Sequence, residues 1–223
     1  MRSALPRSAW HATTPISADG IIIVFARAPL AGRVKTRLAP RLGAAAAARL
    51  HAQLIRKALR TGLDARCGPV ELHTTARHRL LRSLKVHLQL QRGRDLGERM
   101  HYALGSALRR HRRAILIGAD CPALTPADLR QAARWLQGGA DLVFAPAEDG
   151  GYALIGARRI SPAVFAGVEW GGAQVLAKTI ENARRARLEH RLLRTVWDVD
   201  RPEDLERLRS RRFSSGAPRA ARR

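Results

Sequence analysis

The sequence predicts a single α/β domain with a mostly parallel sheet that carries helices on both faces. Short apolar runs rich in β-branched residues alternate along the chain with segments of helical period, and this alternation is typical of such a sheet. With 223 residues and a hydrophobic fraction of 46%, the chain can fill one core. We expect the domain over residues 20–208, between a disordered N-terminal segment (1–19) and a basic disordered tail (209–223).

Strands and helices alternate in the first half of the chain. Gly62 is expected to end the first helix as its C-cap residue, and Asp95 to begin the second as its N-cap. The expected strands are 21–26, 70–74, 86–90 and 114–118, and the expected helices are 44–60 and 96–108.

The second half continues this pattern. Thr125 followed by Pro126 is typical of a helix start, and we expect that helix to run to about Leu136. Further strands are expected at 141–145 and 152–155, an extended segment at 192–199, and helices at 175–183 and 202–208. Because ligands bind beyond the carboxyl ends of parallel strands, the segments that follow the strands are the expected site.

The formal net charge of +23 raises the question of nucleic-acid binding, since Lys and Arg that neutralise phosphates drive such binding. Of 41 basic residues only Lys35, Lys57, Lys85 and Lys178 are lysines, which indicates a coding bias toward arginine. The charge is spread along the chain, and an aromatic fraction of 4% is too small for a base-stacking platform. Nucleic acid is therefore not expected as the main partner.

The cellular compartment follows from what the sequence lacks. No apolar run approaches the ~20 residues that a membrane span needs, and residues 1–20 have no apolar stretch of a secretory signal. Cys67 and Cys121 make neither a disulfide framework nor a zinc motif, which fits a reducing compartment. The sequence predicts a cytoplasmic protein with no membrane partner.

A cluster of cations follows the first expected strand. Arg27, Arg33, Lys35 and Arg37 share a loop with Gly32, and a bound polyphosphate would relieve the repulsion among them. Gly32 would let the backbone approach the phosphates closely. The loop matches neither the P-loop nor the dinucleotide fingerprint, and a solvated basic loop is the alternative interpretation.

Aspartates follow two other expected strands. Asp120 stands just beyond the run 114–118, where an acid can hold Mg²⁺ or Mn²⁺ against a nucleotide diphosphate, although an aspartate that begins a turn is an alternative. Asp198 and Asp200 end the extended segment, and Asp200 is the candidate for a second metal carboxylate.

A pair of acids precedes two glycines at Glu148-Asp149-Gly150-Gly151. A carboxylate in this position can take the proton of an acceptor hydroxyl, while the glycines leave room for substrate. Asp149 is the first candidate for the catalytic base, with Glu148 beside it. The alternative is an ordinary hairpin turn.

Gln91 offers a paired donor and acceptor that can bind the edge of a nucleobase. The eight histidines show no ligand spacing, and none of them is assigned to a metal.

Five segments in this order resemble the bacterial glycosyltransferase-like family (DUF2064-like) of nucleotide-diphospho-sugar transferase fold, which includes members assigned to arsenosugar biosynthesis. The two most specific are Phe25-Ala-Arg-Ala-Pro-Leu-Ala-Gly-Arg-Val-Lys-Thr-Arg-Leu38 and Pro146-Ala-Glu-Asp-Gly-Gly-Tyr152. The others lie at 95–100, 118–122 and 198–204, so the resemblance spans roughly residues 21–208. It implies a GT-A-like, Rossmann-type domain with a metal-dependent donor site.

The resemblance also implies roles for single residues. The phosphates of the donor would be held by Arg27, Lys35 and Arg37, and the base would lie against Gln91 and Gly93. Asp120 would stand where this fold places a metal-binding acid, and Asp149 near the reacting sugar. The acceptor region would comprise Gly150, Gly151, Tyr152 and Trp170.

The chain departs from the family pattern at three points. Arg27 stands where the family usually has lysine. Asp120 is a single acid in place of an Asp-x-Asp pair. Trp170-Gly171-Gly172 stands where the family tends to have Trp-Ser-Thr, which removes two hydroxyls.

Together these features predict a glycosyltransferase that uses a nucleotide-sugar donor, Mg²⁺ or Mn²⁺ and a small-molecule acceptor. Nucleotidyl transfer from a nucleoside triphosphate, with guanylyl or cytidylyl transfer as the models, is one alternative. A catalytically inactive nucleotide-binding protein and a nucleic-acid binder are the others. Association into a homodimer is left open.

Overall fold

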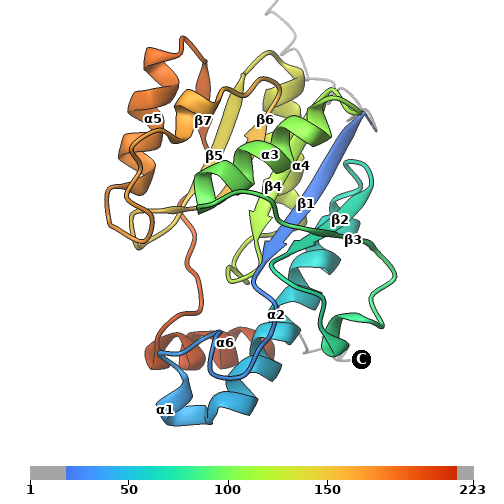
Figure 1. Cartoon of the computed structure of the whole chain (residues 1–223), viewed down its shortest axis with the longest axis vertical. Helices are drawn as coiled ribbons and strands as arrows, with labels where there is room; N and C mark the ends of the chain where they lie inside the picture. Colours follow the sequence, from blue (N-terminus) through green and yellow to red (C-terminus); the bar gives the residue numbers. More distant parts are fainter. Residues whose placement is uncertain (1–18, 215–223) are drawn as a thin grey trace, which may run out of the picture.

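The computed structural model describes residues 19–214, which contain a seven-stranded sheet of order β3-β2-β1-β4-β6-β5-β7 (Figure 1). Of these strands, β6 runs antiparallel to both neighbours, and the other pairs are parallel. The expectation of a mostly parallel sheet is therefore confirmed. The strands are β1 (Gly20–Ala26), β2 (Val70–Thr74), β3 (His87–Leu90), β4 (Arg113–Gly118), β5 (Leu142–Pro146), β6 (Tyr152–Ala157) and β7 (His190–Leu192).

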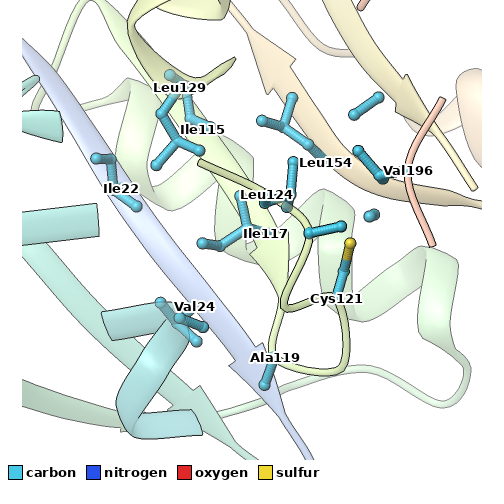
Figure 2. Packing of buried hydrophobic residues seen from close by; sticks show 14 of the residues in the cluster. Ile22, Val24, Ile115, Ile117, Ala119, Cys121, Leu124, Leu129, Leu154 and Val196 are labelled. Carbon is cyan, nitrogen blue, oxygen red and sulfur yellow. The ribbon is translucent and has the colours of Figure 1, made fainter. Parts of the chain in front are cut away.

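Helices cover both faces of the sheet because the side chains of β1 alternate between two apolar clusters. Ile22 and Val24 belong to one cluster, which includes residues of α2 (Ala44–Ala65) and α4 (Pro126–Gln137) (Figure 2). Ile21, Ile23 and Phe25 belong to the other, with residues of α3 (Leu96–Leu108) and α5 (Val175–Arg185). The central strands are thus buried on both sides, as their continuous apolar runs predict.

The helix starts follow the predicted capping residues. The Asp95 side chain accepts a hydrogen bond of 2.8 Å from the backbone N–H of Glu98. Thr125 and Asp128 form a reciprocal capping box at the start of α4. Short 3₁₀ turns, η1 (Arg79–Leu81) and η2 (Pro162–Phe165), complete the connections.

The prediction that Gly62 ends the first helix is wrong. Helix α2 continues to Ala65, and Arg66 adopts the left-handed conformation of the C-cap with φ 54°. Gly62 lies inside the helix, where a Cβ atom would come within 3.2 Å of the Ile22 side chain and 3.3 Å of Val70. This glycine serves the close approach of the helix to the sheet, and not a change of backbone direction.

The C-terminal segment returns to the N-terminal half. Beyond β7 the chain runs extended, with one bridge between Val196 and Ala147, to α6 (Pro202–Ser214). Helix α6 lies beside the short helix α1 (Ala39–Leu42), and Arg41 and Glu206 form an ion pair of 3.5 Å between them (Figure 1).

The predicted terminal segments lie largely beyond the described residues. Helix α6 extends to Ser214, so its end lies within the segment 209–223 expected as a tail. The rest of that segment and residues 1–18 are outside the described part. None of the helices between residues 19 and 214 is both long and apolar enough to cross a membrane.

Candidate active site

Two adjoining cavities lie at the carboxyl ends of the parallel strands. The first, of about 430 Å³, is reached by residues at or just after the ends of β1, β2, β3 and β4, including Arg27, Thr75, Gln91 and Asp120. The second, of about 310 Å³, lies toward β5, β6 and the segment before α5. Both are lined by Leu96, Met100, Gly118, Asp120, Tyr152 and Ala153, so they form one continuous cleft. This cleft lies at the edge of the sheet where the sequence predicts a site.

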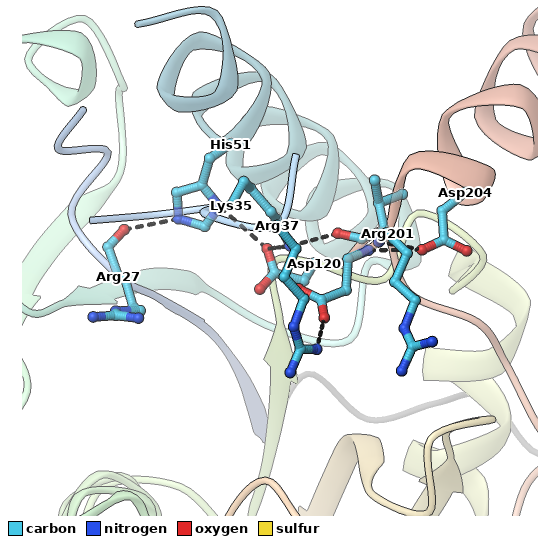
Figure 3. Close-up of polar contacts among 9 residues, drawn as sticks. Arg27, Lys35, Arg37, His51, Asp120, Arg201 and Asp204 are labelled. Atoms are coloured by element: carbon cyan, nitrogen blue, oxygen red, sulfur yellow. Dashed lines mark hydrogen bonds and ion pairs between the residues drawn. The ribbon is translucent and has the colours of Figure 1, made fainter. Parts of the chain in front are cut away.

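Asp120 is the polar centre of this cleft. Its Oδ1 atom lies 2.9 Å from Nζ of Lys35 and 3.1 Å from Nδ1 of His51 (Figure 3). The other ring nitrogen of His51, Nε2, donates to the Arg27 carbonyl oxygen at 3.0 Å. Lys35 also donates to the carbonyl oxygen of Val199 at 2.6 Å, which ties the basic loop to the C-terminal segment.

The electrostatics of Asp120 follow from these contacts. Burial alone would raise the pKa of its carboxyl, but the charge of Lys35 and the hydrogen bond from His51 outweigh burial and hold the pKa well below its ordinary value. The carboxylate is nevertheless 46% exposed to the cleft. Asp120 is therefore ionised at neutral pH, and its second oxygen stays available to a ligand.

The cations of the basic loop divide into two sets. The side chain of Lys35 is 5% exposed, and its backbone adopts a left-handed conformation with φ 50°. Its ammonium group binds the carboxylate of Asp120 and the carbonyl oxygen of Val199. Arg37 pairs with Asp200. Within residues 19–214, in contrast, nothing hydrogen-bonds or ion-pairs with the guanidinium groups of Arg27 and Arg33, which are exposed. Of these two, Arg27 lines the first cavity, whereas Arg33 lies outside both cavities.

Gly32 lies in the same loop with φ 74°, and a Cβ there would meet nothing within 4 Å. Its glycine identity thus fits the left-handed backbone conformation, which L residues rarely adopt.

The two C-terminal aspartates occupy different surroundings. Asp198 lines the second cavity, where burial and then the nearby charge of Asp149 raise the pKa of its carboxyl to about 6. Asp200 does not line either cavity, and Arg37 holds its carboxylate. Its backbone N–H and that of Arg201 donate to Asp204, which fixes the start of α6 (Figure 3). Asp200 as a metal ligand stays a prediction, and Asp198 is the aspartate that shares a cavity with Asp120.

The two acids before the glycines also point apart. Asp149 lines the second cavity and accepts a hydrogen bond of 2.9 Å from the backbone N–H of Gly151. Glu148 lines neither cavity and makes a bidentate pair with Arg207 of α6 at 2.8 and 2.9 Å. The pair lowers the pKa of Glu148, which lies at the surface. Of the two candidate catalytic acids, Asp149 is thus the one within reach of a substrate in the cleft.

Gly150 lines neither cavity, but it contacts the segment before α5, which contributes Trp170, Gly171 and Gly172 to the second cavity. Gly150 has φ 86°, and a Cβ atom there would lie 2.0 Å from the carbonyl oxygen of Ala173. The N–H of Leu176 donates to the Gly150 carbonyl at 2.9 Å. Trp170 and Gly171 line the cavity beside this contact. The turn that carries Asp149 is therefore locked against the segment that carries Trp170.

Tyr152 lies between the two cavities and lines both. Its ring packs edge-on against Phe144, with centroids 5.2 Å apart, and burial raises the pKa of its hydroxyl. It acts as an apolar floor beneath the cleft.

Gln91 lines the first cavity with its amide already oriented. Its Nε2 atom donates to the backbone carbonyl oxygens of Ala26 at 3.1 Å and His73 at 3.0 Å. The –NH₂ group is thereby used, so the side chain offers a ligand its oxygen alone. Gly93 lies outside both cavities, and a Cβ atom there would meet the backbone N of Arg99 at 2.7 Å.

Sequence reasoning missed His51. It faces the sheet from α2 among buried neighbours that include Ala47, Ala48, Ala52 and Leu54. The sequence does show a histidine among the apolar residues of one helix face, which indicates a buried histidine with a polar partner. The spacing of residues does not identify that partner. Arg99 and Thr75 also line the first cavity; Arg99 lies in the matching segment 95–100 but was given no role, and Thr75 belongs to no motif.

Comparisons with known proteins place the fold. The chain is similar to a protein from Desulfovibrio desulfuricans G20 that carries the provisional name nucleotide-diphospho-sugar transferase, with 33% identity, 92% of each chain covered and a TM-score of 0.80. It is also similar in fold to CMP:2-keto-3-deoxy-manno-octonic acid synthetase complexed with CTP (12% identity, 88% of this chain and 99% of that chain, TM-score 0.60).

A third similar structure is glucosyl-3-phosphoglycerate synthase from Mycobacterium tuberculosis, in complex with Mn²⁺, UDP and glucosyl-3-phosphoglycerate. The two chains share 11% identity over 88% of this chain and 77% of that chain, with a TM-score of 0.52. The α/β fold of this chain is thus the GT-A-like fold of nucleotidyl and glycosyl transferases. No curated protein matches the sequence significantly.

The family model described as "Uncharacterized protein conserved in bacteria (DUF2064)" matches residues 58–172, just over half of the chain. This range runs from within α2 to the second-cavity wall at Gly172. Together with the 33% identity to the Desulfovibrio protein over 92% of the chain, the match shows that the protein belongs to the DUF2064 family.

Proposed function

We propose that this protein is a glycosyltransferase that binds a nucleotide-sugar with Mg²⁺ or Mn²⁺ and transfers the sugar to a small acceptor. One observation carries the proposal: two adjoining cavities meet at Asp120, the first lined by Arg27 and Arg99 and the second by Asp149 and Asp198. A donor nucleotide in the first cavity would place its sugar at the boundary, where an acceptor in the second could reach it.

A divalent cation fits the oxygens at this boundary. Among residues 19–214 no three His, Cys, Asp or Glu side chains form a complete metal cluster. Mg²⁺ and Mn²⁺ commonly take only one or two carboxylates and complete their shell with phosphate oxygens and water. The free oxygen of Asp120 and the carboxylate of Asp198 are hard ligands that share the second cavity, and they would hold the ion together with the donor. Bound there, the ion would neutralise charge on the departing nucleoside diphosphate.

The protein's own groups divide the remaining work. The unpaired guanidinium groups of Arg27 and Arg33 would bind the diphosphate through charge-assisted hydrogen bonds. Lys35 would act indirectly, because it holds Asp120 in its ionised form and joins it to the segment that carries Asp198. Gln91 would accept a hydrogen bond from an N–H group of the base.

Asp149 would serve as the general base. One of its oxygens accepts from the N–H of Gly151, which orients the carboxylate toward the cavity that it lines. In the transfer the bond between the sugar C1 and the leaving phosphate oxygen breaks, and a bond from the acceptor oxygen to C1 forms. The proton of the acceptor hydroxyl passes to Asp149, and the electron pair of the broken bond leaves with the nucleoside diphosphate.

The test is thermal unfolding with a panel of nucleotide-sugars, nucleoside triphosphates and a short RNA, each with and without Mn²⁺. A ligand at about a hundred times its Kd stabilises the native state by ~2.7 kcal/mol, which raises the midpoint by roughly 5–10 °C in a domain of this size. A metal-dependent shift with one nucleotide-sugar supports the proposal and identifies the donor. A shift with a triphosphate alone, or with RNA alone, contradicts it.

Two variants sharpen that test. Asp120→Asn keeps the size of the side chain but removes its charge, and should abolish both the Mn²⁺-dependent part of the shift and turnover. Asp64→Asn is the matched control, since Asp64 lies at the surface of α2 in an ion pair with Arg60. Full activity in the Asp120 variant would remove Asp120 from the metal site.

A further inference from the structure

The acceptor side of the cleft has a charge that is unexpected in this chain. The protein carries 41 Lys and Arg residues against 18 Asp and Glu. Three aspartates (Asp120, Asp149 and Asp198) nevertheless line the second cavity, and none of its lining residues within the described part of the chain is Lys, Arg or His. The first cavity, which adjoins it, is lined by Arg27 and Arg99. The cleft is therefore divided by charge at Asp120.

Neighbouring side chains compensate this charge only in part, through Lys35. Asp120 is matched by Lys35, but no ion pair reaches Asp149 or Asp198 from the residues that the structure describes. Asp149 and Asp198 line the same cavity. A metal ion at Asp120 and Asp198 would arrive with the negative diphosphate of the donor, so Asp149 would still present an uncompensated negative charge to an acceptor.

The same cavity is also lined by one aromatic side chain and two glycines. Trp170 packs on one side against Phe165, with ring centroids 6.3 Å apart, and lines the cavity together with Gly171 and Gly172. An indole face beside a carboxylate binds the C–H face of a sugar or a cationic amine, and it gives no donor pair to a phosphate. The contact of Gly150 with Ala173 holds the segment that carries Trp170 against the turn that carries Asp149.

We propose that the second cavity takes an acceptor that is a neutral or cationic hydroxyl compound, and that it rejects acceptors carrying a phosphate or carboxylate group. A like charge beside Asp149 would be repelled, while a hydroxyl or an ammonium group would be attracted. This inference rests on the proposed function, because only a transferase has an acceptor. The charge preference that it assigns to the cavity can nevertheless be measured without turnover.

The first experiment measures the electrostatic field at Trp170 with small ions. Quenching of tryptophan fluorescence is titrated with caesium and with iodide, in the wild type and in Trp170→Phe, and the difference gives the Trp170 contribution. With each quenching constant divided by that of free N-acetyltryptophanamide, caesium should quench that contribution more strongly than iodide although the whole protein is positive, and Asp149→Asn should reduce the ratio. Equal normalised quenching by the two ions, or stronger normalised quenching by iodide, overturns the inference whether or not any nucleotide-sugar binds.

The second experiment compares acceptors that differ in one charged group, with the nucleotide-sugar identified by thermal unfolding. Glucose, glucosamine and glucose 6-phosphate are titrated by calorimetry into the protein loaded with the nucleoside diphosphate and Mn²⁺. Glucose 6-phosphate should bind at least ~10-fold more weakly than glucose or glucosamine, which corresponds to a difference of ~1.4 kcal/mol in binding free energy.

A variant supplies the converse result. Gly172 is exposed, its φ lies outside the left-handed range, and a Cβ atom would meet only the Glu169 carbonyl oxygen at 3.3 Å. Gly172→Lys therefore adds a cation to the wall of the cavity, and it should reduce the difference in affinity between glucose and glucose 6-phosphate. Gly172→Ser should leave that difference unchanged. A wild-type protein that binds the phosphorylated sugar as well as glucose or better contradicts the inference, whereas absence of nucleotide-sugar binding contradicts only the proposed function.

Discussion

The ammonium of Lys35 lies 2.9 Å from the carboxylate of Asp120, so the loop after β1 and the loop after β4 share one ion pair, in which Lys35 is buried and Asp120 faces the cleft. The same ammonium binds the carbonyl oxygen of Val199, and the backbone N–H of Val199 donates to the Asp120 carbonyl at 2.9 Å. Three segments far apart in the sequence are thus joined at the centre of the cleft. The lysine that the sequence assigns to phosphate binding is a structural link between the loops that would hold donor and metal.

Lys35→Met should therefore lower stability as well as activity. The substitution removes the cation from this pair and leaves the Val199 carbonyl without its donor, at a cost of about 1–3 kcal/mol given that the Asp120 carboxylate is half exposed. Urea denaturation measures this loss. Arg33→Met, at an exposed cation of the same loop, should leave the free energy of unfolding unchanged and weaken nucleotide binding only. A Lys35 variant of wild-type stability would show that the link is unimportant.

Gln91→Met should lower nucleotide affinity by about 10-fold and destabilise the first cavity. The variant keeps the length of the side chain but removes the donors to the carbonyl oxygens of Ala26 and His73, and the acceptor with them. Gln91→Glu should be worse, because a carboxylate would face those two carbonyl oxygens. Calorimetric titration with the donor checks both, and the exposed Gln53→Met serves as control. Unchanged affinity in both variants would exclude Gln91 from the base site.

Asp128 should make the protein sensitive to acid. Burial acts to raise the pKa of its carboxyl, but hydrogen bonds from Arg194 at 2.7 and 2.9 Å and from Thr125 outweigh burial and lower the pKa. A lowered pKa means that the carboxylate stabilises the folded state above the ordinary carboxyl range, and that this contribution disappears as pH falls below about 4. Arg194 leads into the segment that carries Asp198, so this segment should loosen in acid.

The measurement is the free energy of unfolding at several pH values for the wild type and Asp128→Asn. The difference between them should be largest near neutral pH and shrink as the medium becomes more acidic. A difference that stays constant with pH would mean that Asp128 acts through its cap geometry and not through its charge.

Gly150→Ala should damage the second cavity more than Gly171→Ala does. The new Cβ atom would overlap the carbonyl oxygen of Ala173 in a backbone conformation that alanine rarely adopts, at a cost of about 2–4 kcal/mol. Gly171→Ala shares the positive φ but opens onto free space, so strain of about 1 kcal/mol is expected. Thermal unfolding ranks the two variants, and the reverse order would contradict the locked wall.

Sequence reasoning recovered the fold well because the strands are buried on both faces. Continuous apolar runs such as 21–26 and 114–118 have no second interpretation once helices alternate with them. It failed at Gly62, where a glycine fits because the side chains of Ile22 and Val70 leave little room for a Cβ atom. This contact is visible only in the folded chain.

The candidate site was predictable in its elements but not in its pairings. The cations and acids could be placed after strands, yet the partners of Glu148 and Asp200 come from α6 and from the basic loop. Such long-range ion pairs leave no periodic trace in the sequence. His51 was overlooked for the same reason, because its contact with Asp120 joins a helix to a distant loop.

The order of the strands has a consequence for how members of this family can diverge. Apart from Tyr152 in β6, the polar residues that line the first cavity all lie at or before Asp120 in the sequence. The second cavity is also lined by Asp149, Trp170 and Asp198, which lie after Asp120. The polar residues that line one cavity alone thus come from separate stretches of the chain, whereas Asp120 and five other residues line both cavities. Substitutions at Asp149, Trp170 or Asp198 can therefore change which substrate binds the second cavity, while the residues that bind the other substrate in the first cavity stay the same.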